Sequence, residues 1–413
     1  MYLCTKITTN MKYLLSFVST LLLFTACSKS ESNEPEDPMG QRTVMVYMSG
    51  DNDLSSYAQM DINEMIAGAS NIPTKNNLVV FVDRQKTGER PFIAKVTGNQ
   101  QQPLDTLYKY SSDFYACDPE KFSAVLQRMT TLCPAREYGL VLWGHASGWV
   151  VPTDTIKSNR AYGKDGNKWM NITQMAVALK SLPKMKFIFA DCCNMMCAEV
   201  GYELRNATEY LIGSPAEIPG NGAPYETVVP NFFKSGTALY KGIIDAYYEG
   251  HNSTATFGVP MSVIDTKYVS DLAVATAGIL EQAKGGYPQK PDAPDLSGIA
   301  FTFGYDVKMM YDMRAVIERL VPTDAFKQWD SVFQQAVPYY RMSMRWMTNF
   351  DGRSGTYDLL SAFDTFDPTL SYGCVTMFLP HTGYGYEKGD LVYNERSKNF
   401  SWTHIMNWSR FGW

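Results

Sequence analysis

The chain has 413 residues, of which 45% are hydrophobic and 19% charged, and its formal net charge is −5. This composition is typical of a folded globular protein of roughly two or three domains. A mildly acidic chain without a basic stripe lacks the electrostatic footprint of a nucleic-acid binder, so we exclude that class.

The N-terminus is typical of an export signal. Lys12 precedes an apolar run, residues 14–24, which is too short to span a bilayer as a helix. Phe24-Thr25-Ala26-Cys27 resembles the bacterial lipoprotein box, in which the cysteine is lipidated. The alternative is a simple secretory signal with a coincidental cysteine. We expect a signal peptide over 1–26, a disordered tether over 27–41, and an exported protein anchored at the outer membrane or cell surface through Cys27 alone.

From residue 42 onward, apolar runs alternate with amphipathic segments. Near-continuous apolar strands separated by helices are typical of a mostly parallel sheet covered by helices on both faces, an α/β fold. Strands are predicted at Thr43–Met48, Asn77–Val82, Phe92–Val96, Tyr138–Trp143, Lys186–Ala190 and Glu209–Gly213. Helices are predicted at Pro119–Thr131, Asn171–Leu182 and about Met195–Arg205, and an exposed loop at Val151–Lys168.

Residues 236–413 are predicted to form a C-terminal α+β region packed on a core at 42–235. Its predicted elements are helices at Ala238–Tyr248, Tyr268–Ala283 and Asp306–Leu320, a Pro-rich linker at Tyr287–Pro294 and a strand at Cys374–Leu379.

A histidine and a cysteine follow two of the predicted strands. His145 comes after the strand that ends at Trp143, and Cys193 after the strand that ends at Ala190. Because carboxyl ends of parallel strands meet at one edge of a sheet, we expect the two to lie together. A thiolate there, favoured by the following helix N-terminus, would attack a carbonyl, and His145 would protonate the leaving amine. Backbone N–H groups of Cys193 and of a neighbour of His145 would bind the oxyanion.

Each of these residues also has a structural interpretation. His145 could be a satisfied core histidine, and Cys193 a small buried hydrophobe. Cys192 is expected to face the other way from Cys193 and to pack structurally. The cysteines beyond the leader are scattered along the chain, so we expect no disulfide framework. Cys192, Cys193 and Cys197 lack the spacing of a zinc site, so we expect no bound metal.

Several segments resemble the clostripain-like cysteine peptidases, relatives of the caspases and gingipains. They are Val44–Leu54, Leu142–Trp149, Asp191–Cys193 with Glu199 following, Pro219–Tyr225 and, more weakly, Tyr357–Leu359 and Phe400–Trp402. The resemblance implies a caspase-like core and a cysteine endopeptidase that acts on proteins or peptides. It makes His145 the catalytic histidine, Cys193 the nucleophile and Asp191 the acid that binds a basic P1 side chain, so that cleavage follows Arg or Lys.

Three departures from the family pattern stand out. Ala146 replaces the usual Gly after the histidine, so its N–H serves as an oxyanion donor only if Ala146 keeps an allowed φ. Asn194-Met195 replaces the usual Leu-Met after the nucleophile. Asn221, which we assign to the substrate pocket, stands where relatives carry a second pocket acid, and this weakens the basis for the Arg/Lys preference.

The resemblance also bears on maturation and cofactors. Relatives cut themselves between the histidine and cysteine strands, and here Lys157, Arg160 and Lys164 lie in the polar 151–168 stretch. We expect no cofactor. The alternative is calcium, which some relatives require. The acidic segment Asp51–Asp53 could hold the ion, but it lacks the spacing of a calcium-binding loop. The rival functions are a catalytically silent surface lipoprotein that binds peptide or glycan on the same fold, and a thiol amidase of small substrates.

Overall fold

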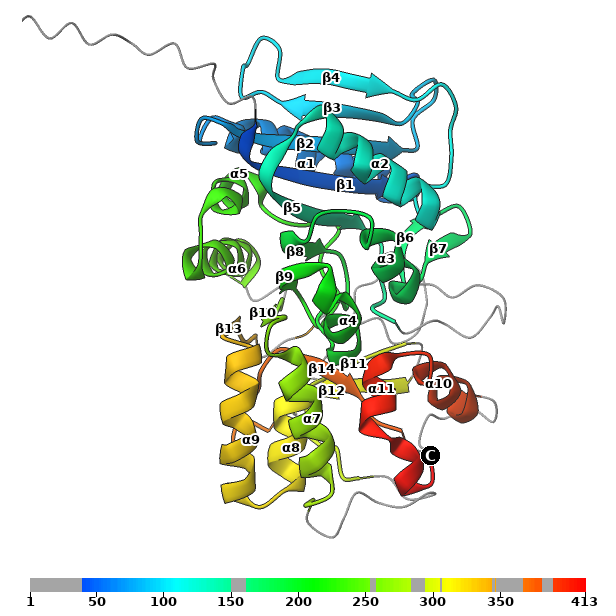
Figure 1. Ribbon diagram of the computed structural model, residues 1–413, viewed down its shortest axis with the longest axis vertical. Coiled ribbons are helices and arrows are strands. Elements are labelled where there is room, and N and C mark those ends of the chain that lie inside the picture. The colour runs from blue at the N-terminus through cyan, green and yellow to red at the C-terminus, as the bar shows by residue number, and fades with distance from the viewer. Residues whose placement is uncertain are drawn as a thin grey trace, which may run out of the picture. The chain divides into compact units, whose positions relative to one another are not determined.

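A nine-stranded sheet forms the centre of the described part of the chain, in the order β13-β10-β9-β8-β5-β1-β2-β3-β4 (Figure 1). The computed structural model describes residues 39–149, 161–252, 258–283, 294–304, 307–343, 346, 367–380 and 389–413. Residues 38–413 form one compact unit. The signal peptide, Cys27, Lys157, Arg160 and Tyr357–Leu359 lie outside the described residues.

The inner strands of this sheet are parallel. They are β1 (Gly40–Gly50), β2 (Asn76–Arg84), β5 (Ala135–Gly144), β8 (Met185–Asp191) and β9 (Thr208–Gly213). Antiparallel strands extend both edges: β3 (Phe92–Val96) and β4 (Leu104–Lys109) beside β2, and β10 (Met261–Asp265) and β13 (Tyr339–Arg341) beside β9. The predicted α/β fold with a mostly parallel sheet is confirmed, and two strands from beyond residue 236 join the sheet of residues 42–235.

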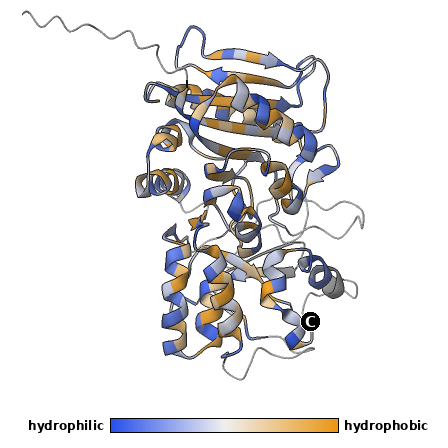
Figure 2. Ribbon diagram, in the orientation of Figure 1, coloured by the Kyte–Doolittle hydropathy of each residue, from blue (hydrophilic) through white to orange (hydrophobic). Residues whose placement is uncertain are grey.

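Helices cover both faces of the sheet, because successive side chains of each buried strand point to opposite sides. One face, here the α1 face, carries Val141, Trp143, Phe187 and Phe189 and is covered by α1 (Ser55–Ala69), α5 (Tyr225–Val228), the 3-10 helix η2 (Val229–Phe233) and α6 (Thr237–Asn252). The opposite α2 face carries Leu140, Leu142, Ile188 and Ala190 and is covered by α2 (Pro119–Leu132), α3 (Ile172–Leu179) and α4 (Ala198–Glu203). Figure 2 shows the inner strands as the most hydrophobic part of this layer.

Local signals explain the start of α2. The Asp118 side chain accepts hydrogen bonds from the N–H groups of Glu120 and Lys121 at 3.0 and 3.1 Å, and Pro119 occupies the first helical position. The buried residues Phe122, Val125, Leu126 and Met129 form one apolar stripe. The helix predicted here is therefore confirmed.

The C-terminal region forms a second layer of helices and a small antiparallel sheet, seen in the lower half of Figure 1. Its sheet has the order β11-β12-β14 within the described residues, with β11 (Phe301–Gly304), β12 (Val307–Asp312) and β14 (Thr376–Phe378). Its helices are α7 (Val269–Leu280), α8 (Met313–Leu320), α9 (Thr323–Ala336), α10 (Gly389–Ser397), α11 (Ser401–Met406) and the 3-10 helix η4 (Trp408–Phe411). β14 is tied to the core because the N–H of Thr376 donates to Met196 O at 3.0 Å and the N–H of Phe378 donates to Glu199 Oε1 at 2.9 Å.

Three predicted elements differ from the structure. The helix predicted from residue 306 begins only at α8, because 307–312 is strand β12 and the Asp312 side chain caps the helix. The helix predicted from Met195 begins at Ala198 and continues beyond Glu203 as the 3-10 helix η1 (Leu204–Asn206). The predicted loop contains β6 (Tyr162–Asp165) and the start of β7 (Lys168–Met170), and Tyr162 is fully buried.

Candidate active site

The register of the sheet places His145 and Cys193 at the same level of neighbouring strands. β5 and β8 pair with Trp143 opposite Asp191, and His145 and Cys193 each lie two residues further along. Both residues lie just beyond their strands, which end at Gly144 and Asp191. Trp143 and Cys193 pack in the hydrophobic cluster on the α1 face. The structure thus brings the two candidate residues to the ends of adjacent strands.

Two glycines allow close packing of the loop after β5: Gly144 lies against β1, where a Cβ would be 2.7 Å from Ser49 O, and Gly148 lies against the loop after β8. Gly144 has φ +135°, and Gly148 has φ +62°. A Cβ on Gly148 would lie 2.5 Å from the carbonyl oxygen of Asn194, the residue after Cys193. The segment that carries His145 therefore packs directly on the segment that carries Cys193, and only glycine fits at the point of contact.

His145 is held through one ring nitrogen. Its Nε2 lies 3.0 Å from Asp53 Oδ1, and Lys164 Nζ lies 3.3 Å from the same oxygen. Partial burial opposes ionisation of Asp53, but His145 and Lys164 outweigh it and keep the pKa of Asp53 below its usual value. An ionised carboxylate can only accept, so Nε2 carries the proton and Nδ1 keeps the free lone pair. Burial lowers the pKa of His145, and Asp53 offsets only part of this shift.

Cys193 is half-buried, and its sulfur faces the segment after β9. The N–H of Ile218 donates to Sγ at 3.4 Å. Burial, followed by the charge of Glu217, raises the pKa of the Cys193 thiol to about 12. The expected help from a helix N-terminus is missing, because Asn194 has φ +61° and α4 starts only at Ala198. The resting site therefore holds a neutral thiol and a neutral imidazole.

Ala146 lies in a short bridge that leaves its own N–H free. It pairs with Tyr162 of β6, while the N–H of Ser147 donates to Ala161 O and the N–H of Gly163 donates to His145 O. In such a non-hydrogen-bonded pair, the N–H of Ala146 points away from β6. Ala146 is not among the residues with positive φ, so the replacement of glycine causes no strain here.

Cys192 faces the opposite side of the sheet from Cys193. It is 1% exposed and belongs to the cluster on the α2 face with Ile188 and Ala190. The six cysteines within the described residues are all free thiols. No group of three or more histidine, cysteine or acidic side chains in the described ranges is placed to hold a metal ion.

Asp191 is a buried carboxyl two residues before Cys193. Its Oδ2 accepts hydrogen bonds from the N–H of Ala223 at 3.1 Å and from the Tyr225 hydroxyl at 2.7 Å. Its Oδ1 is buried, and the Tyr247 hydroxyl also interacts with this carboxyl. Burial raises the pKa of Asp191 to about 6. Gly222, with φ +52°, packs so closely that a Cβ there would lie 2.7 Å from Asp191 Oδ2. The neighbouring Asn221, which we predicted as a pocket residue, is exposed at the tip of the turn.

Two acids of this site, Asp53 and Asp61, were not predicted as site residues. Asp53 appears in the sequence analysis only as an oxygen ligand for calcium. Asp61 is 1% exposed on α1, and its Oδ2 accepts a hydrogen bond from Trp143 Nε1 at 2.5 Å. A signal for it existed, because Asp61 interrupts the apolar positions Ala58, Ile62 and Met65 at helical spacing.

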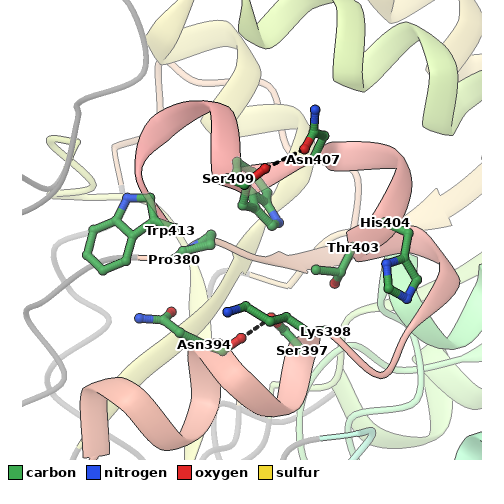
Figure 3. Close-up of a pocket in the computed structure, with 10 residues that line it drawn as sticks. Pro380, Asn394, Ser397, Lys398, Thr403, His404, Asn407, Ser409 and Trp413 are labelled. Atoms are coloured by element: carbon green, nitrogen blue, oxygen red, sulfur yellow. Dashed lines mark hydrogen bonds between the residues drawn. The ribbon is translucent and has the colours of Figure 1, made fainter.

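A hollow lies in the C-terminal region, among residues 380–413. Figure 3 shows this pocket of about 210 Å³ between α10, α11 and η4. Its lining includes His404, Lys398 and Trp413 but no cysteine. It therefore offers no thiol to His404. Within the described part of the chain, no helix has the length and apolar character to cross a membrane.

Comparisons with known proteins identify the family and fold. A secreted C11 cysteine protease from Bacteroides thetaiotaomicron, solved with an irreversible peptide inhibitor, is 26% identical with a TM-score of 0.71, over 90% of this chain and 100% of that chain. An inactive zymogen C11 protease from Parabacteroides distasonis shares the fold at 24% identity and a TM-score of 0.72, over 89% of this chain and 98% of that chain. Comparison with curated proteins gives no match. The model of the clostripain family matches residues 46–360, so the chain belongs to this family and is a cysteine peptidase.

Proposed function

We propose that the chain is an exported endopeptidase in which His145 and Cys193 form the catalytic dyad and which cleaves after Arg or Lys. The observation that supports this most strongly is that the two residues follow adjacent parallel strands, each two positions beyond the Trp143–Asp191 pair. A thiol and an imidazole on adjacent strand ends are the minimum equipment for covalent cysteine catalysis.

The chemistry follows from the state of each group. Cys193 transfers its proton to Nδ1 of His145, the nitrogen that Asp53 leaves free, and the thiolate attacks the substrate carbonyl. The N–H groups of Cys193 and Ala146 stabilise the oxyanion. The imidazolium then protonates the leaving amine, and water hydrolyses the acyl-enzyme to restore the thiol.

The preference for a basic P1 side chain rests on Asp191. This carboxyl lies two residues before Cys193 and is buried, 3% exposed. Among the described residues no lysine or arginine forms an ion pair with it. A buried acid without a cation favours a positively charged substrate group.

The assay is hydrolysis of an arginyl peptide amide by wild type, Cys193→Ala and Cys192→Ala. We expect turnover in wild type and Cys192→Ala, and none in Cys193→Ala. Turnover that survives in Cys193→Ala would contradict the dyad, and a complete lack of thiol-dependent turnover would favour a silent binding protein. Hydrolysis of small amides without cleavage of proteins would instead indicate an amidase.

We also propose that the enzyme cuts itself between the two catalytic strands, at Lys157 or Arg160. Both residues lie in the stretch that joins the His145 loop to β6, which supports their access to the site. N-terminal sequencing is expected to find a fragment that begins just after one of them in wild type and not in Cys193→Ala. An active enzyme that remains uncut would contradict self-processing.

For localisation we propose lipidation at Cys27. The support is the Phe24–Cys27 motif together with the relative described as secreted. Cys27→Ser is expected to release the protein from the membrane fraction and abolish metabolic labelling with palmitate. Unchanged labelling would contradict the anchor.

No cofactor enters the proposed reaction, since both the nucleophile and the general acid are side chains. Asp53, a candidate calcium ligand by sequence, bonds with His145 and Lys164. Excess EDTA is expected to leave hydrolysis of the arginyl amide unchanged. Loss of activity that added calcium restores would contradict this.

A further inference from the structure

The C-terminal pocket is a hollow that takes no part in the proposed reaction. It has a volume of about 210 Å³ and is lined by residues of α10, α11 and η4 together with Pro380. Figure 3 shows α10 along one side and the segment 403–413 along the other. Pockets for drug-sized ligands usually hold about 300–1,000 Å³. This pocket is therefore sized for a smaller group, such as one residue of a peptide.

Asn394 brings an unsatisfied hydrogen-bond acceptor to this pocket. The residue lies on α10, is 7% exposed and lines the hollow. Its Oδ1 atom is buried and has no hydrogen-bond partner. Buried polar atoms in proteins are rarely left unpaired. A ligand with an N–H or O–H group beside Asn394 would supply the missing donor.

The side chains that line the pocket can carry positive charge but no negative charge. The ten lining residues, all in the described part of the chain, include Lys398 and His404 but no aspartate or glutamate. Lys398 Nζ pairs with Glu395 Oε1 at 2.5 Å, and the two side chains are 49% and 62% exposed. Exposed pairs of this kind are weak, so Lys398 can exchange Glu395 for another carboxylate. The pocket is therefore complementary to an anionic group.

The wall that completes the pocket is apolar. Pro380 and the half-buried Trp413 both line the hollow. An indole presents a broad apolar face, on which an apolar side chain of a ligand can pack. A cationic side chain would instead be repelled by Lys398 in the same small space. These walls favour a ligand that joins an apolar side chain to a negative charge and a hydrogen-bond donor.

We propose that this pocket binds the C-terminal residue of a peptide that ends in an apolar side chain and a free carboxylate. The carboxylate replaces Glu395 at Lys398, the backbone N–H of the last residue donates to Asn394 Oδ1, and the side chain packs on Trp413 and Pro380. The proposed products of the enzyme itself end in Arg or Lys and are poor ligands, because they bring a like charge to Lys398. The proposal does not depend on the catalytic dyad.

Calorimetry with full-length Cys193→Ala tests the ligand class without turnover. The probe is N-acetyl-Gly-Gly-Leu with a free carboxylate, and it is compared with its C-terminal amide, with N-acetyl-Gly-Gly-Arg acid and with glucuronate. We expect the Leu acid to bind with a Kd of about 0.1–1 mM, and each of the others to bind about tenfold more weakly or worse. Equal binding of the Leu acid and its amide would overturn the proposal. Glucuronate that binds as tightly as the Leu acid would indicate a site for acidic sugars and would also overturn it.

Two substitutions at the ion pair are expected to change the affinity for the Leu acid in opposite directions. Lys398→Met removes the charge, keeps a long apolar stem and is expected to weaken binding about tenfold. Glu395→Gln removes the competing carboxylate and is expected to tighten binding about threefold. Lys327→Met is the matched control, because Lys327 forms an exposed i,i+3 pair with Asp324 on α9 and does not line this pocket. Unchanged affinity in Lys398→Met, or an equal loss in Lys327→Met, would contradict the role of Lys398.

Asn394→Leu separates a role in binding from support of the fold. Leucine is similar in size to asparagine but has no acceptor, so the free protein loses a buried atom that had no partner. We expect the midpoint of thermal unfolding to stay the same or rise, while the affinity for the Leu acid falls about tenfold. A lower midpoint with unchanged affinity would show that Asn394 only supports α10, and would overturn its role in binding. Since none of these measurements follows hydrolysis, their outcomes are independent of whether Cys193 is the nucleophile.

Discussion

Burial is the main cause of the lowered pKa of His145, and two neighbouring residues pull that pKa in opposite directions. Asp53 accepts from Nε2 and raises the pKa, while Lys164 bonds to the same carboxylate and lowers it. Burial outweighs Asp53, so the imidazole is neutral at physiological pH and ready to accept a proton at Nδ1. In the proposed mechanism Asp53 is a positioning residue, since it fixes the tautomer of His145.

Two variants that shift the acid limb of the pH–rate profile in opposite directions test this arrangement. Asp53→Asn is expected to lower kcat/KM about tenfold and to move the acid limb to lower pH, because a group that raises the His145 pKa is lost. Lys164→Met removes a group that lowers that pKa and is expected to move the limb to higher pH. A pH–rate profile of each variant checks both. Shifts in the same direction, or none, would contradict the role of Asp53.

At the scale of elements, sequence patterns predict the buried strands but not the short or polar pieces. The inner strands are continuous apolar runs, so β1, β2, β5, β8 and β9 follow directly from the sequence. β6 and β13 are too short and polar to give a pattern. The start of α4 depends on bonds from Asn194 and Met196 to Ala216 and Ser214, which only the folded chain reveals.

Sequence patterns likewise predict some residues of the candidate site but not others. His145, Cys193 and Asp191 are prominent because they end apolar strands, where parallel topology brings residues together. Asp53 and Asp61 come from the segment after β1, and their relation to the site depends on how α1 packs across the sheet. Sequence spacing does not contain that information, although a charge inside the apolar stripe of α1 points to it.

Substitution of two glycines by alanine, one at the contact and one away from it, tests the contact between the His145 loop and the Cys193 loop. Gly148 and Gly88 have φ +62° and +79°, but a Cβ would strike Asn194 only at Gly148 and would meet nothing within 4 Å at Gly88. Gly88→Ala is expected to cost about 1 kcal/mol of stability and no activity. Gly148→Ala is expected to lower kcat/KM roughly a hundredfold by separating the loops. Similar activities of the two variants would contradict direct packing of these loops.

At the scale of the whole molecule, Glu199 joins the core to the C-terminal region. It lies on α4, is fully buried and accepts the Phe378 N–H of β14 at 2.9 Å. Burial raises its pKa to about 7. Its contribution to stability is therefore fully present below the unfolded pKa near 4.5 and is lost as pH rises through 7.

Denaturant unfolding at several pH values tests this connection. Glu199→Gln keeps the acceptor for Phe378 but does not titrate, so wild type should lose about 2 kcal/mol more than this variant between pH 5 and 8. Glu199→Ala should be destabilised at every pH, because Phe378 loses its acceptor. Parallel pH profiles of wild type and Glu199→Gln would show that Glu199 does not titrate in this range.

Covalent labelling tests the central claim, the pairing of His145 with Cys193, most directly. Wild type, Cys193→Ala, Cys192→Ala and His145→Ala are treated with an arginyl chloromethyl ketone, and the adduct is located by peptide mass spectrometry. The account predicts one adduct on Cys193 in wild type and Cys192→Ala, none in Cys193→Ala, and greatly slowed labelling in His145→Ala. An adduct on another cysteine, or labelling of Cys193 at an unchanged rate without His145, would contradict it.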